Sequence, residues 1–527
     1  MSIKPKYDVV IVGAGPVGTA MANLLGTYGV STLVIDKESE IIEIPRAIGL
    51  CEEGSRVLSA AGVLDAFSPD TLKINKIRMD EPYGTSMAHT DPSVTINGYP
   101  SMRTFYQPAM ERCLRKCLEQ YDHVDLSVAT ECTEFRDEGD QVKVVLAKAD
   151  QKIEVACSFM IASDGSTSPT RKKLNIGFDG KTYGEDWIVF DAENNPEPND
   201  QVALLCNRER PGITMSAPNG RRRWEFIVRE DDDREAILED KSIAELLKPW
   251  GDVRDMALTR KTIYTFHARM ADRFREGNVF LIGDAAHITP PFAGQGLMAG
   301  FRDCYNLAWK IRDVLNGRAN TDLLATYDTE RMPQVKQIIW FAKFIGSSLL
   351  PASRWRSFLR DLILKTGRAT GAHSDTKPLP IRKLSNHING KWPRHSLIRK
   401  FRKTGFEMPQ TTVEGANGET KLLDRFLGDS HYLVAFNQDP SDRLSESLMA
   451  RWKSAGGHSL NLSIEGGNAP VDRACLTLTD HSGEYQELLN GGTQFLVVRP
   501  DKMIMVNCKA GQLETRLNHY LSQIETA

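Results

Sequence analysis

The feature that most constrains the fold is a glycine-rich turn between two short apolar runs near the N-terminus. The run Val9–Val12 is rich in β-branched residues, which is typical of a strand buried on both faces of a parallel sheet. It leads into the sequence Gly-Ala-Gly-Pro-Val-Gly at 13–18, a segment of helical composition at 19–28 and a second apolar run at 32–35. This spacing predicts a right-handed strand, helix, strand unit.

The glycine spacing suits the binding of a dinucleotide, and a purely structural glycine loop is the disfavoured alternative. In such a motif the first glycine permits a tight turn, the second lets the backbone approach a pyrophosphate, and the third lets helix and strand pack closely. Asp36, at the end of the second run, is placed to accept hydrogen bonds from ribose hydroxyls. The cofactor contacts predicted here are Gly13, Gly15, Pro16, Gly18, Asp36 and Lys37.

The composition excludes several other classes of protein. The 527 residues carry 66 Lys and Arg against 69 Asp and Glu, so the net charge of −3 provides no field that would attract nucleic acid. The nine cysteines are irregularly spaced and odd in number, which does not predict a disulfide framework. Because no Cys-x-x-Cys pair occurs, we expect neither a metal site nor a dithiol redox site.

The apolar segments are too short for export or for a membrane span. The first apolar run ends at Gly13, too early for the core of a signal peptide. Another apolar stretch, residues 338–350, is interrupted by Lys343 and Gly346 and is shorter than the roughly 18 residues that cross a bilayer. These features predict a cytoplasmic enzyme.

The rest of the chain alternates between two kinds of pattern. Short strand-like runs dominate residues 124–161 and 185–270, whereas 278–315 returns to a strand followed by a helix. Strand-rich segments inserted between strand and helix units indicate two interleaved domains. A stretch rich in Gly, Pro and basic residues at 367–405 predicts a linker, and 406–527 carries a separate pattern of strands with a closing helix.

A second glycine-rich segment favours FAD as the bound dinucleotide. Gly283 and Asp284 follow the apolar run 279–282, and Gly294 and Gly296 stand at the start of a predicted helix. A carboxylate in this position can hold a ribityl hydroxyl of a flavin. Backbone N–H groups at a helix start can stabilise negative charge on the reduced flavin ring.

Asp164 and Gly165, which follow another apolar run, complete a set of three motifs that resembles the group A, single-component FAD-dependent aromatic hydroxylases. The dinucleotide fingerprint, the Asp-Gly motif and the Gly-Asp motif occur in that family's order within residues 1–345. The nearer resemblance is to the 3-(3-hydroxyphenyl)propionate hydroxylase branch. It is carried by the segments 45–49, 107–108, 222–226, 264–268 and 300–303.

The resemblance implies a mixed α/β fold in which a Rossmann-like FAD-binding domain is interleaved with a β-sheet substrate domain. The C-terminal segment is similar to the thioredoxin-like appendage of this branch, but without Cys-x-x-Cys its expected role is packing or contact in a homodimer. The expected boundaries are 1–75, 104–185 and 275–345 for the FAD-binding domain, 76–103 and 186–274 for the substrate domain, 346–405 for a helical segment and linker, and 406–527 for the thioredoxin-like domain.

The resemblance also implies an NAD(P)H-dependent monooxygenase. NADH or NADPH would reduce FAD, O2 would add to give a flavin C4a-hydroperoxide, and one oxygen atom would pass to a phenolic ring ortho to its hydroxyl. The expected substrate is a small phenolic acid such as a hydroxyphenylpropionate. The same chemistry on a larger phenolic or polyketide substrate is the alternative. A flavin halogenase is disfavoured because its Trp-x-Trp-x-Ile-Pro segment is absent, and a flavin-binding scaffold without turnover because the glycine motifs are intact.

Site residues follow from their positions in these motifs. Arg46 and Gln107 are expected to contact FAD, and Asp164 to support the pyrophosphate. Asp284 is expected to bind the ribityl chain. Pro291, Gly294 and Gly296 are expected to line the face of the flavin ring where oxygen reacts. Gly283 and Leu297 are further expected cofactor contacts.

The residue that activates the phenol is left open. Some phenol hydroxylases carry an acid before the glycine of the Arg-Ala-x-Gly segment, but here Ile48 stands there. Tyr264 and His267 are candidates because a strand could bring them near the ring pocket, and the alternative is a hydrogen-bonded core tyrosine and a structural histidine. His287 is expected to support the fold. For Arg223, a structural pair across strands is favoured over a clamp on a substrate carboxylate.

Overall fold

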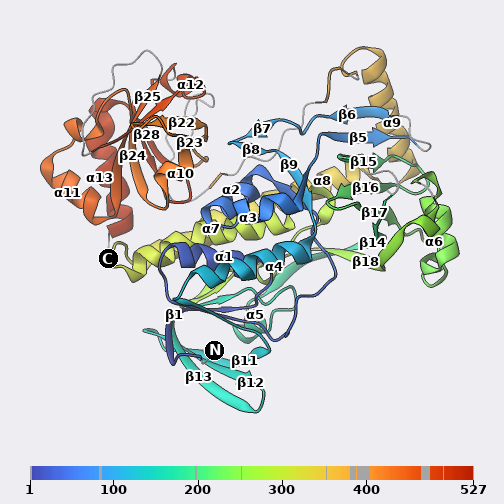
Figure 1. The fold of residues 1–527 in the computed structure, drawn as a ribbon, viewed down its shortest axis with the longest axis horizontal. Coiled ribbons are helices and arrows are strands. Elements are labelled where there is room, and N and C mark those ends of the chain that lie inside the picture. Colours follow the sequence, from blue (N-terminus) through green and yellow to red (C-terminus); the bar gives the residue numbers. More distant parts are fainter. Residues whose placement is uncertain are drawn as a thin grey trace.

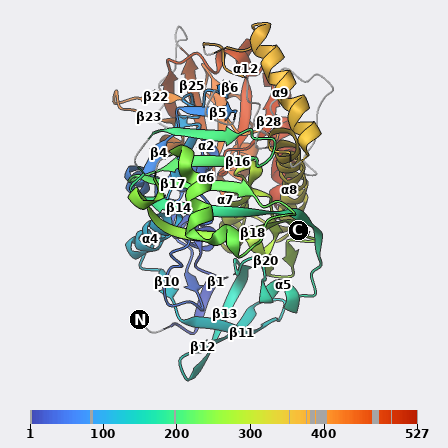
Figure 2. The ribbon, with the colours of Figure 1, turned by 90° about the vertical axis from the view of Figure 1, so that its right-hand side faces the viewer.

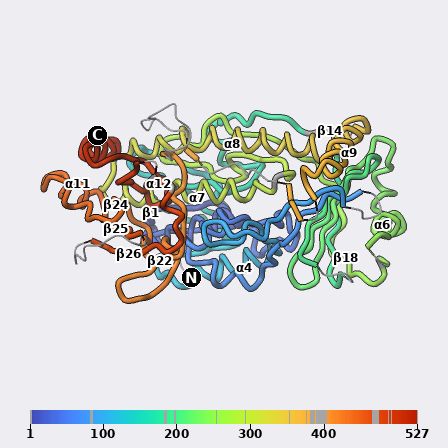
Figure 3. Tube along the Cα trace, turned by 90° about the horizontal axis from the view of Figure 1, so that it is seen from above, coloured from blue at the N-terminus to red at the C-terminus, as the bar shows by residue number. Residues whose placement is uncertain are grey.

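The computed structural model forms three neighbouring parts. It describes residues 3–81, 86–195, 199–250, 252–351, 353–374, 376–379, 387–388, 404–464, 475–490 and 492–525. Figure 1 shows the first part, around β1 (Lys6–Val12), at the lower centre, a second sheet at the right and the C-terminal part at the left. Seen from above in Figure 3, the long helix α8 (Asp322–Leu349) extends from the first part toward the second.

The first part is built on an eight-stranded sheet whose central strands are parallel. β1 pairs with β2 (Thr32–Ile35) on one side and with β13 (Gln151–Ala162) on the other, and β20 (Val279–Leu281) pairs with β13. The predicted strand, helix, strand unit is confirmed, with α1 (Pro16–Thr27) between β1 and β2. The remaining strands are β10 (Val124–Ser127), β11 (Thr130–Asp137), β12 (Val142–Lys148) and β19 (Arg275–Glu276).

Helices cover this sheet, and Figure 1 shows α1, α4 and α7 lying together above β1. A Cβ on Gly300 of α7 would lie 2.6 Å from a methyl group of Val17, so glycine at position 300 allows α1 and α7 to approach closely. The helices of this part are α2 (Glu52–Ala60), α3 (Leu64–Phe67), α4 (Gln107–Cys117), α5 (Pro169–Lys173), α7 (Gly296–Leu315) and α8. Within the described ranges, none of the helices is long and apolar enough to cross a membrane.

The second part is an eight-stranded sheet assembled from distant segments. Its longest strands, β14 (Phe178–Glu193) and β18 (Ala257–Ala271), pair antiparallel. β5 (Lys76–Asp80) and β6 (Ser86–Thr90) join from much earlier in the chain, so the two parts interleave along the sequence. Figure 2 faces this sheet, with α6 (Asp240–Leu247) in front and α9 (Arg354–Ala369) at its outer edge. The other strands are β15 (Gln201–Leu205), β16 (Gly212–Ala217), β17 (Arg221–Ile227) and β21 (His287–Ile288).

Two small sheets complete these parts. The three-stranded sheet contains β3 (Gly49–Cys51), β9 (Met102–Phe105) and β4 (Thr71–Lys73). The two-stranded sheet contains β7 (Thr95–Ile96) and β8 (Tyr99–Pro100). In the three-stranded sheet, β3 and β4 both pair antiparallel with β9, which links segments before and after the polar stretch near residue 90.

The C-terminal part is a seven-stranded mixed sheet between two apolar cores. Leu433 and Ala435 of β24 (His431–Phe436) enter one core, whereas Tyr432 and Val434 enter the other. This alternation is expected for a strand covered on both faces. The other strands are β22 (Thr412–Gly415), β23 (Thr420–Leu422), β25 (Gly457–Ile464), β26 (Leu476–Asp480), β27 (Phe495–Val498) and β28 (Ile504–Cys508). The helices are α10 (Leu423–Leu427), α11 (Glu446–Ser454), α12 (Gln486–Asn490) and α13 (Leu513–Glu525).

Candidate functional site

Three separate segments of the chain meet at one edge of the first sheet. In the parallel register Val12 of β1 lies opposite Ile35 of β2 and Ala162 of β13. Ala162 in turn lies opposite Leu281 of β20. The loops after these strands therefore begin side by side. The crevice outside the carboxyl ends of parallel strands is where open α/β sheets bind ligands.

The three glycines of the first loop are required for different reasons. Gly13 has a φ of +107°, and a Cβ there would lie 2.3 Å from the carbonyl oxygen of Ser163. A Cβ on Gly18 would lie 2.0 Å from the carbonyl oxygen of Gly13. Gly15 has an ordinary φ of −71°, and a Cβ there would meet no described atom within 4 Å. The open space beside Gly15 therefore fits a ligand that approaches the backbone closely, as a pyrophosphate does.

The start of α1 offers N–H groups to such a ligand. Gly15 is the N-cap residue, no side chain caps the helix, and Pro16 occupies the first helical position. Uncapped N–H groups and the positive end of the helix dipole favour a bound anion. This arrangement fits the diphosphate of FAD.

Asp36 holds the glycine loop against the end of β2. One carboxylate oxygen accepts a hydrogen bond from the Ala14 N–H at 2.7 Å, and the other accepts one from the Glu38 N–H at 2.9 Å. The side chain is half-buried, and each oxygen keeps a further lone pair for a ribose hydroxyl. Lys37 is exposed, with its Nζ 3.8 Å from a carboxylate oxygen of Glu38.

Asp164 organises the loop after β13. Its Oδ1 accepts a hydrogen bond from the Ser168 hydroxyl at 2.5 Å, and its Oδ2 accepts one from the Thr170 N–H at 3.0 Å. Both oxygens thus stabilise the turn that carries them. Because the neighbouring Ser163 borders Gly13, this turn lies beside the glycine loop.

Asp284 presents an exposed carboxylate in the loop that follows β20. Its side chain makes no hydrogen bond or ion pair with another described residue. The loop continues directly from the aligned strand ends, so the carboxylate lies in the crevice region. Because this carboxylate has no partner among the described residues, it can accept a hydrogen bond from a ribityl hydroxyl of the flavin.

A buried acid holds the Asp284 loop, and the sequence did not identify it as a site residue. Asp303 of α7 accepts hydrogen bonds from the Gly283 N–H at 3.0 Å and from the Arg331 Nε at 2.8 Å, and it contacts the His287 Nε2 at 2.7 Å. Burial raises the pKa of Asp303, but His287 and Arg331 outweigh this effect and hold the pKa below its ordinary value. His287 therefore serves the fold. The sequence held one indication of this role, because Asp303 belongs to the segment 300–303 that carries the resemblance to the hydroxylase branch.

The start of α7 lies next to this loop. A Cβ on Gly300, one turn into the helix, would lie 3.3 Å from the Gly283 Cα. Gly294 has a φ of +60° and open space where a Cβ would stand, and no side chain caps the helix after it. These N–H groups can stabilise an anionic flavin ring. The predicted cofactor contacts Pro291, Gly294, Gly296 and Leu297 are all exposed or half-buried here.

Gln107 supports the loop that carries Arg46. Its Oε1 accepts hydrogen bonds from the Arg46 N–H at 2.9 Å and the Ala47 N–H at 2.7 Å. Its Nε2 donates to Glu111 at 2.8 Å. The amide of Gln107 is buried and engaged in positioning, whereas the Arg46 side chain is exposed.

Arg223 joins this loop to the second sheet. Its Nε donates to Asp191 at 2.7 Å, across the register of β14 and β17. Its Nη1 and Nη2 donate to the carbonyl oxygens of Arg46 at 2.8 Å and Pro45 at 2.6 Å. Arg223 is only 2% exposed and all of these contacts are with protein groups, so it forms a structural ion pair with Asp191.

Arg115 is a further candidate that the sequence missed. Its Nη2 donates to the Ala14 carbonyl oxygen at 3.2 Å, so the guanidinium lies beside the glycine loop. Its Nε makes no hydrogen bond within the described part of the chain. A guanidinium in this place suits a phosphate oxygen. One helix face carries Gln107, Glu111 and Arg115 at the spacing i, i+4, i+8. This spacing could have indicated from the sequence that Arg115 lies on the same side as Gln107.

The two candidates for phenol activation have different surroundings. The Tyr264 ring lies 5.5 Å from the ring of Phe266, which lies 5.5 Å from that of Phe292 in the loop before α7. His267 has its Nδ1 3.0 Å from the Thr182 hydroxyl. Neighbouring side chains of a strand point to opposite faces. The structure therefore brings Tyr264, but not His267, into the aromatic cluster beside the loop that precedes α7.

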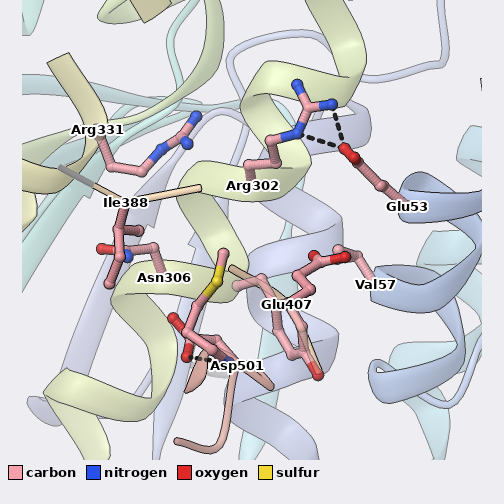
Figure 4. Close-up of a pocket in the computed structure, with 10 residues that line it drawn as sticks. Glu53, Val57, Arg302, Asn306, Arg331, Ile388, Glu407 and Asp501 are labelled. Carbon is pink, nitrogen blue, oxygen red and sulfur yellow. Dashed lines mark hydrogen bonds and ion pairs between the residues drawn. The ribbon is translucent and has the colours of Figure 1, made fainter. Parts of the chain in front are cut away.

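A small cavity lies elsewhere, between the first part and the C-terminal part (Figure 4). Glu53 and Arg302 line it from α2 and α7, and Glu407 and Asp501 line it from the C-terminal part. It has room for about one water molecule. Its size and its lining residues distinguish it from the crevice at the glycine loops.

Family models match most of the chain. Residues 6–342 match the family described as FAD binding domain, and residues 405–523 match the HcaD C-terminal domain. The first match covers the three motifs and more than half of the chain.

Curated relatives resemble the chain over nearly their whole length. A 3-(3-hydroxy-phenyl)propionate/3-hydroxycinnamic acid hydroxylase of Burkholderia cenocepacia is 37% identical over 454 residues, which cover 86% of this chain and 83% of the relative. A protein of the same name from Escherichia coli O81 is 31% identical over 536 residues, which cover 99% of this chain and 95% of the relative.

Solved structures share the fold. The flavin-dependent monooxygenase PieE, solved with FAD and substrate, superposes with a TM-score of 0.79 at 18% identity and covers 99% of this chain and 100% of its own. Aklavinone-11 hydroxylase, solved with FAD and aklavinone, has a TM-score of 0.76 at 22% identity over the same shares. The chain therefore belongs to the FAD binding domain family, and it is a flavin-dependent monooxygenase of the aromatic hydroxylase type with FAD as its cofactor.

Proposed function

We propose that this monooxygenase hydroxylates a small phenolic acid, of the hydroxyphenylpropionate or hydroxycinnamate kind, ortho to its hydroxyl group. NADH or NADPH and O2 are the co-substrates. The proposal rests on relatives at 31–37% identity whose names carry this activity. The structural observation behind the flavin chemistry is the crevice where Gly15 faces open space and the exposed Asp284 carboxylate has no described protein partner, and this crevice supports the FAD site on which the reaction depends.

The residues of this crevice have separate binding roles in the proposal. FAD supplies the transfer of two electrons from the nicotinamide and the activation of O2. The N–H groups at the start of α1 bind the diphosphate, assisted by Arg115. Asp284 binds a ribityl hydroxyl. The N–H groups at the start of α7, next to Gly294, stabilise negative charge on the ring and orient it.

An apolar cluster supplies the wall of the substrate site. Trp187 and Phe266 are buried in it, and Phe292 lies 5.5 Å from each of them between ring centroids. Such a wall packs an aromatic ring and excludes water from the reacting atoms. The Tyr264 hydroxyl, at the exposed edge of this cluster, accepts a hydrogen bond from the phenol hydroxyl of the substrate and so orients the phenol oxygen.

We also propose the domain boundaries stated from the sequence. The membership of β5, β6 and β14–β18 in one sheet supports a substrate domain built from 76–103 and 186–274, and the first residues of β14 extend this sheet back to Phe178. A thioredoxin-like fold for 406–527 is supported by the parallel neighbours β26, β25 and β24, the antiparallel β27 and β28, and the closing helix α13. A cytoplasmic location and a homodimer stay predictions.

The test is an assay of the purified protein. We expect a bound-flavin absorption spectrum, and oxidation of NADH or NADPH that 3-(3-hydroxyphenyl)propionate or 3-hydroxycinnamate stimulates, with one oxygen atom added to the product. A colourless protein that binds no added FAD would contradict the flavin site. Stimulation by a larger polyketide phenol, but by no phenolic acid, would contradict only the substrate.

A further inference from the structure

Helix α9 has its polar side inside and its apolar side outside. Ser357, Arg360 and Asp361 are at most 6% exposed. The large apolar side chains of the same helix face solvent, namely Trp355, Phe358, Leu359, Leu362 and Ile363, at 39–69% exposure. Surface helices of monomeric proteins normally show the opposite arrangement.

Hydrogen bonds fix this orientation of α9. Arg360 donates to the carbonyl oxygens of Leu349 and Cys206, both at 2.8 Å. Asp361 accepts a hydrogen bond from the Arg208 Nε at 2.8 Å and pairs with Arg360 at 2.7 Å. A rotation that buried the apolar side would break these bonds and leave buried charges unpaired, which is costly. The outward apolar side is therefore a stable feature of the fold.

The last turns of α8 add two more exposed aromatic rings. Trp340 is 64% exposed and stacks on Phe344, with ring centroids 5.8 Å apart. Trp355 stacks on Phe358 in the same way at 5.6 Å. An aromatic side chain presents roughly 150–250 Å², so the four exposed rings, together with the three smaller aliphatic side chains of α9, leave on the order of 700 Å² uncovered in sum. A typical monomer has no apolar patch larger than about 600 Å².

We propose that this surface, formed by α9 and the end of α8, is the interface of a homodimer about a two-fold axis. A stable interface buries about 800 Å² on each partner, which is close to the apolar area of this surface. Interfaces also have an apolar centre and a polar rim. Figure 2 shows α9 at the outer edge of the molecule, where a second copy can approach it.

The charges at the two ends of α9 suit a second copy of the chain. Arg354 pairs with Glu209 at 2.7 Å at the start of the helix, and Lys365 pairs with Glu81 near its end. A two-fold axis across the centre of α9 places the start of one helix beside the end of the other. The ion pair at each end of α9 then lies beside an ion pair of the partner, so each rim cation has an acid of the second copy within its surroundings. An anionic membrane surface is the other candidate for a basic amphipathic helix, because Arg356 and Arg368 are also exposed on α9, and vesicle binding is therefore one outcome of the test.

The proposal does not depend on the substrate. The experiment uses the full-length, FAD-loaded protein and compares it with the double variant Leu362→Asp, Ile363→Asp. Multi-angle light scattering is expected to give twice the chain mass for the wild type and the single chain mass for the variant. Flavin absorption and the rate of NAD(P)H oxidation should be unchanged. The matched control Val94→Asp introduces an acid at another apolar position, 51% exposed, and should remain dimeric.

A crosslinking variant keeps the proposal testable if the double variant fails to fold. Leu362→Cys should form an intermolecular disulfide under mild oxidation, because residue 362 lies near the centre of α9 and thus near the axis. The wild type, whose nine cysteines are all buried or half-buried, should not. A monomeric wild type, a double variant that stays dimeric, or a wild type that binds anionic vesicles as a monomer would each overturn the proposal.

Discussion

Arg499 of the C-terminal part and Glu330 of α8 form an ion pair in which neither side chain is accessible to solvent. The Arg499 Nη1 lies 2.7 Å from a Glu330 carboxylate oxygen. Lys310 lies 2.9 Å from the other oxygen, and Asp501 balances Arg499. The C-terminal part is thus joined to the flavin-binding part by buried charges, so it is an integral part of the enzyme's fold.

Removal of this pair should destabilise the protein. In Glu330→Gln the side chain keeps its shape but leaves Lys310 and Arg499 without their shared carboxylate, and breaking a buried pair costs about 3–5 kcal/mol. Urea unfolding of the FAD-loaded protein measures the change. Arg425→Met is the matched control, because Arg425 pairs with Asp65 between the same two parts on the surface. The control should change the free energy of unfolding by at most about 1 kcal/mol, and equal effects would contradict the importance of burial.

The same carboxylate predicts a dependence of stability on pH. Burial raises the pKa of Glu330, but Arg499 and Lys310 outweigh it and hold the pKa well below its usual 4.5. A folded-state pKa below the unfolded one contributes stability above pH 4.5 that is lost as the pH falls. Urea unfolding at pH 7 and pH 4 should therefore show a smaller loss in Glu330→Gln than in the wild type. If Glu330→Gln and the wild type lose the same free energy of unfolding between pH 7 and pH 4, carboxylates other than Glu330 cause the acid sensitivity.

Two glycine substitutions should separate ligand binding from folding. In Gly15→Ala the new methyl group meets no described atom, so the free energy of unfolding of the apoprotein should change by at most about 1 kcal/mol while FAD affinity falls. In Gly18→Ala the methyl group would collide with the Gly13 carbonyl oxygen and destabilise the apoprotein by about 1–3 kcal/mol. Thermal unfolding and FAD titration distinguish the two. Normal FAD affinity in Gly15→Ala would contradict the diphosphate site.

Asp284→Asn should weaken FAD binding without unfolding the protein. A hydrogen bond to a charged group contributes about 1.5–3 kcal/mol, so the dissociation constant should rise roughly tenfold to hundredfold. Quenching of flavin fluorescence on titration of the apoprotein measures it. Asp140→Asn, which changes an exposed acid in the loop between β11 and β12, is the control and should bind FAD normally. Full FAD retention in Asp284→Asn would remove its assigned role.

Tyr264 and His267 should differ in their effect on the reaction. Tyr264→Phe removes the hydroxyl proposed to orient the phenol, so kcat/KM for the phenolic substrate should fall about tenfold, the equivalent of one hydrogen bond. His267→Ala removes a group that contacts Thr182 and should leave kcat/KM unchanged. Rates of product formation at limiting substrate provide the comparison. A larger loss in His267→Ala would reverse the assignment.

Much of the flavin crevice could be predicted from local patterns in the chain. The β1, α1, β2 unit follows from an apolar run, a glycine motif and a second run, because strand and helix periods involve neighbouring residues. The motifs around Asp164 and Asp284 likewise follow runs that form strands. The family resemblance, carried by the same motifs, is confirmed by relatives and by the family match.

The remaining features depend on contacts between residues far apart in the chain. The sequence contained Asp303, Arg223 and Arg499, but only the folded arrangement places them beside Gly283, Pro45 and Glu330 respectively. The outward apolar side of α9 has the same origin, because its helical period shows two sides and does not reveal which one packs inward. The partners that settle this, such as Cys206 for Arg360, lie more than a hundred residues away. Periodicity is a local property, whereas the burial of a charge depends on which distant groups satisfy it.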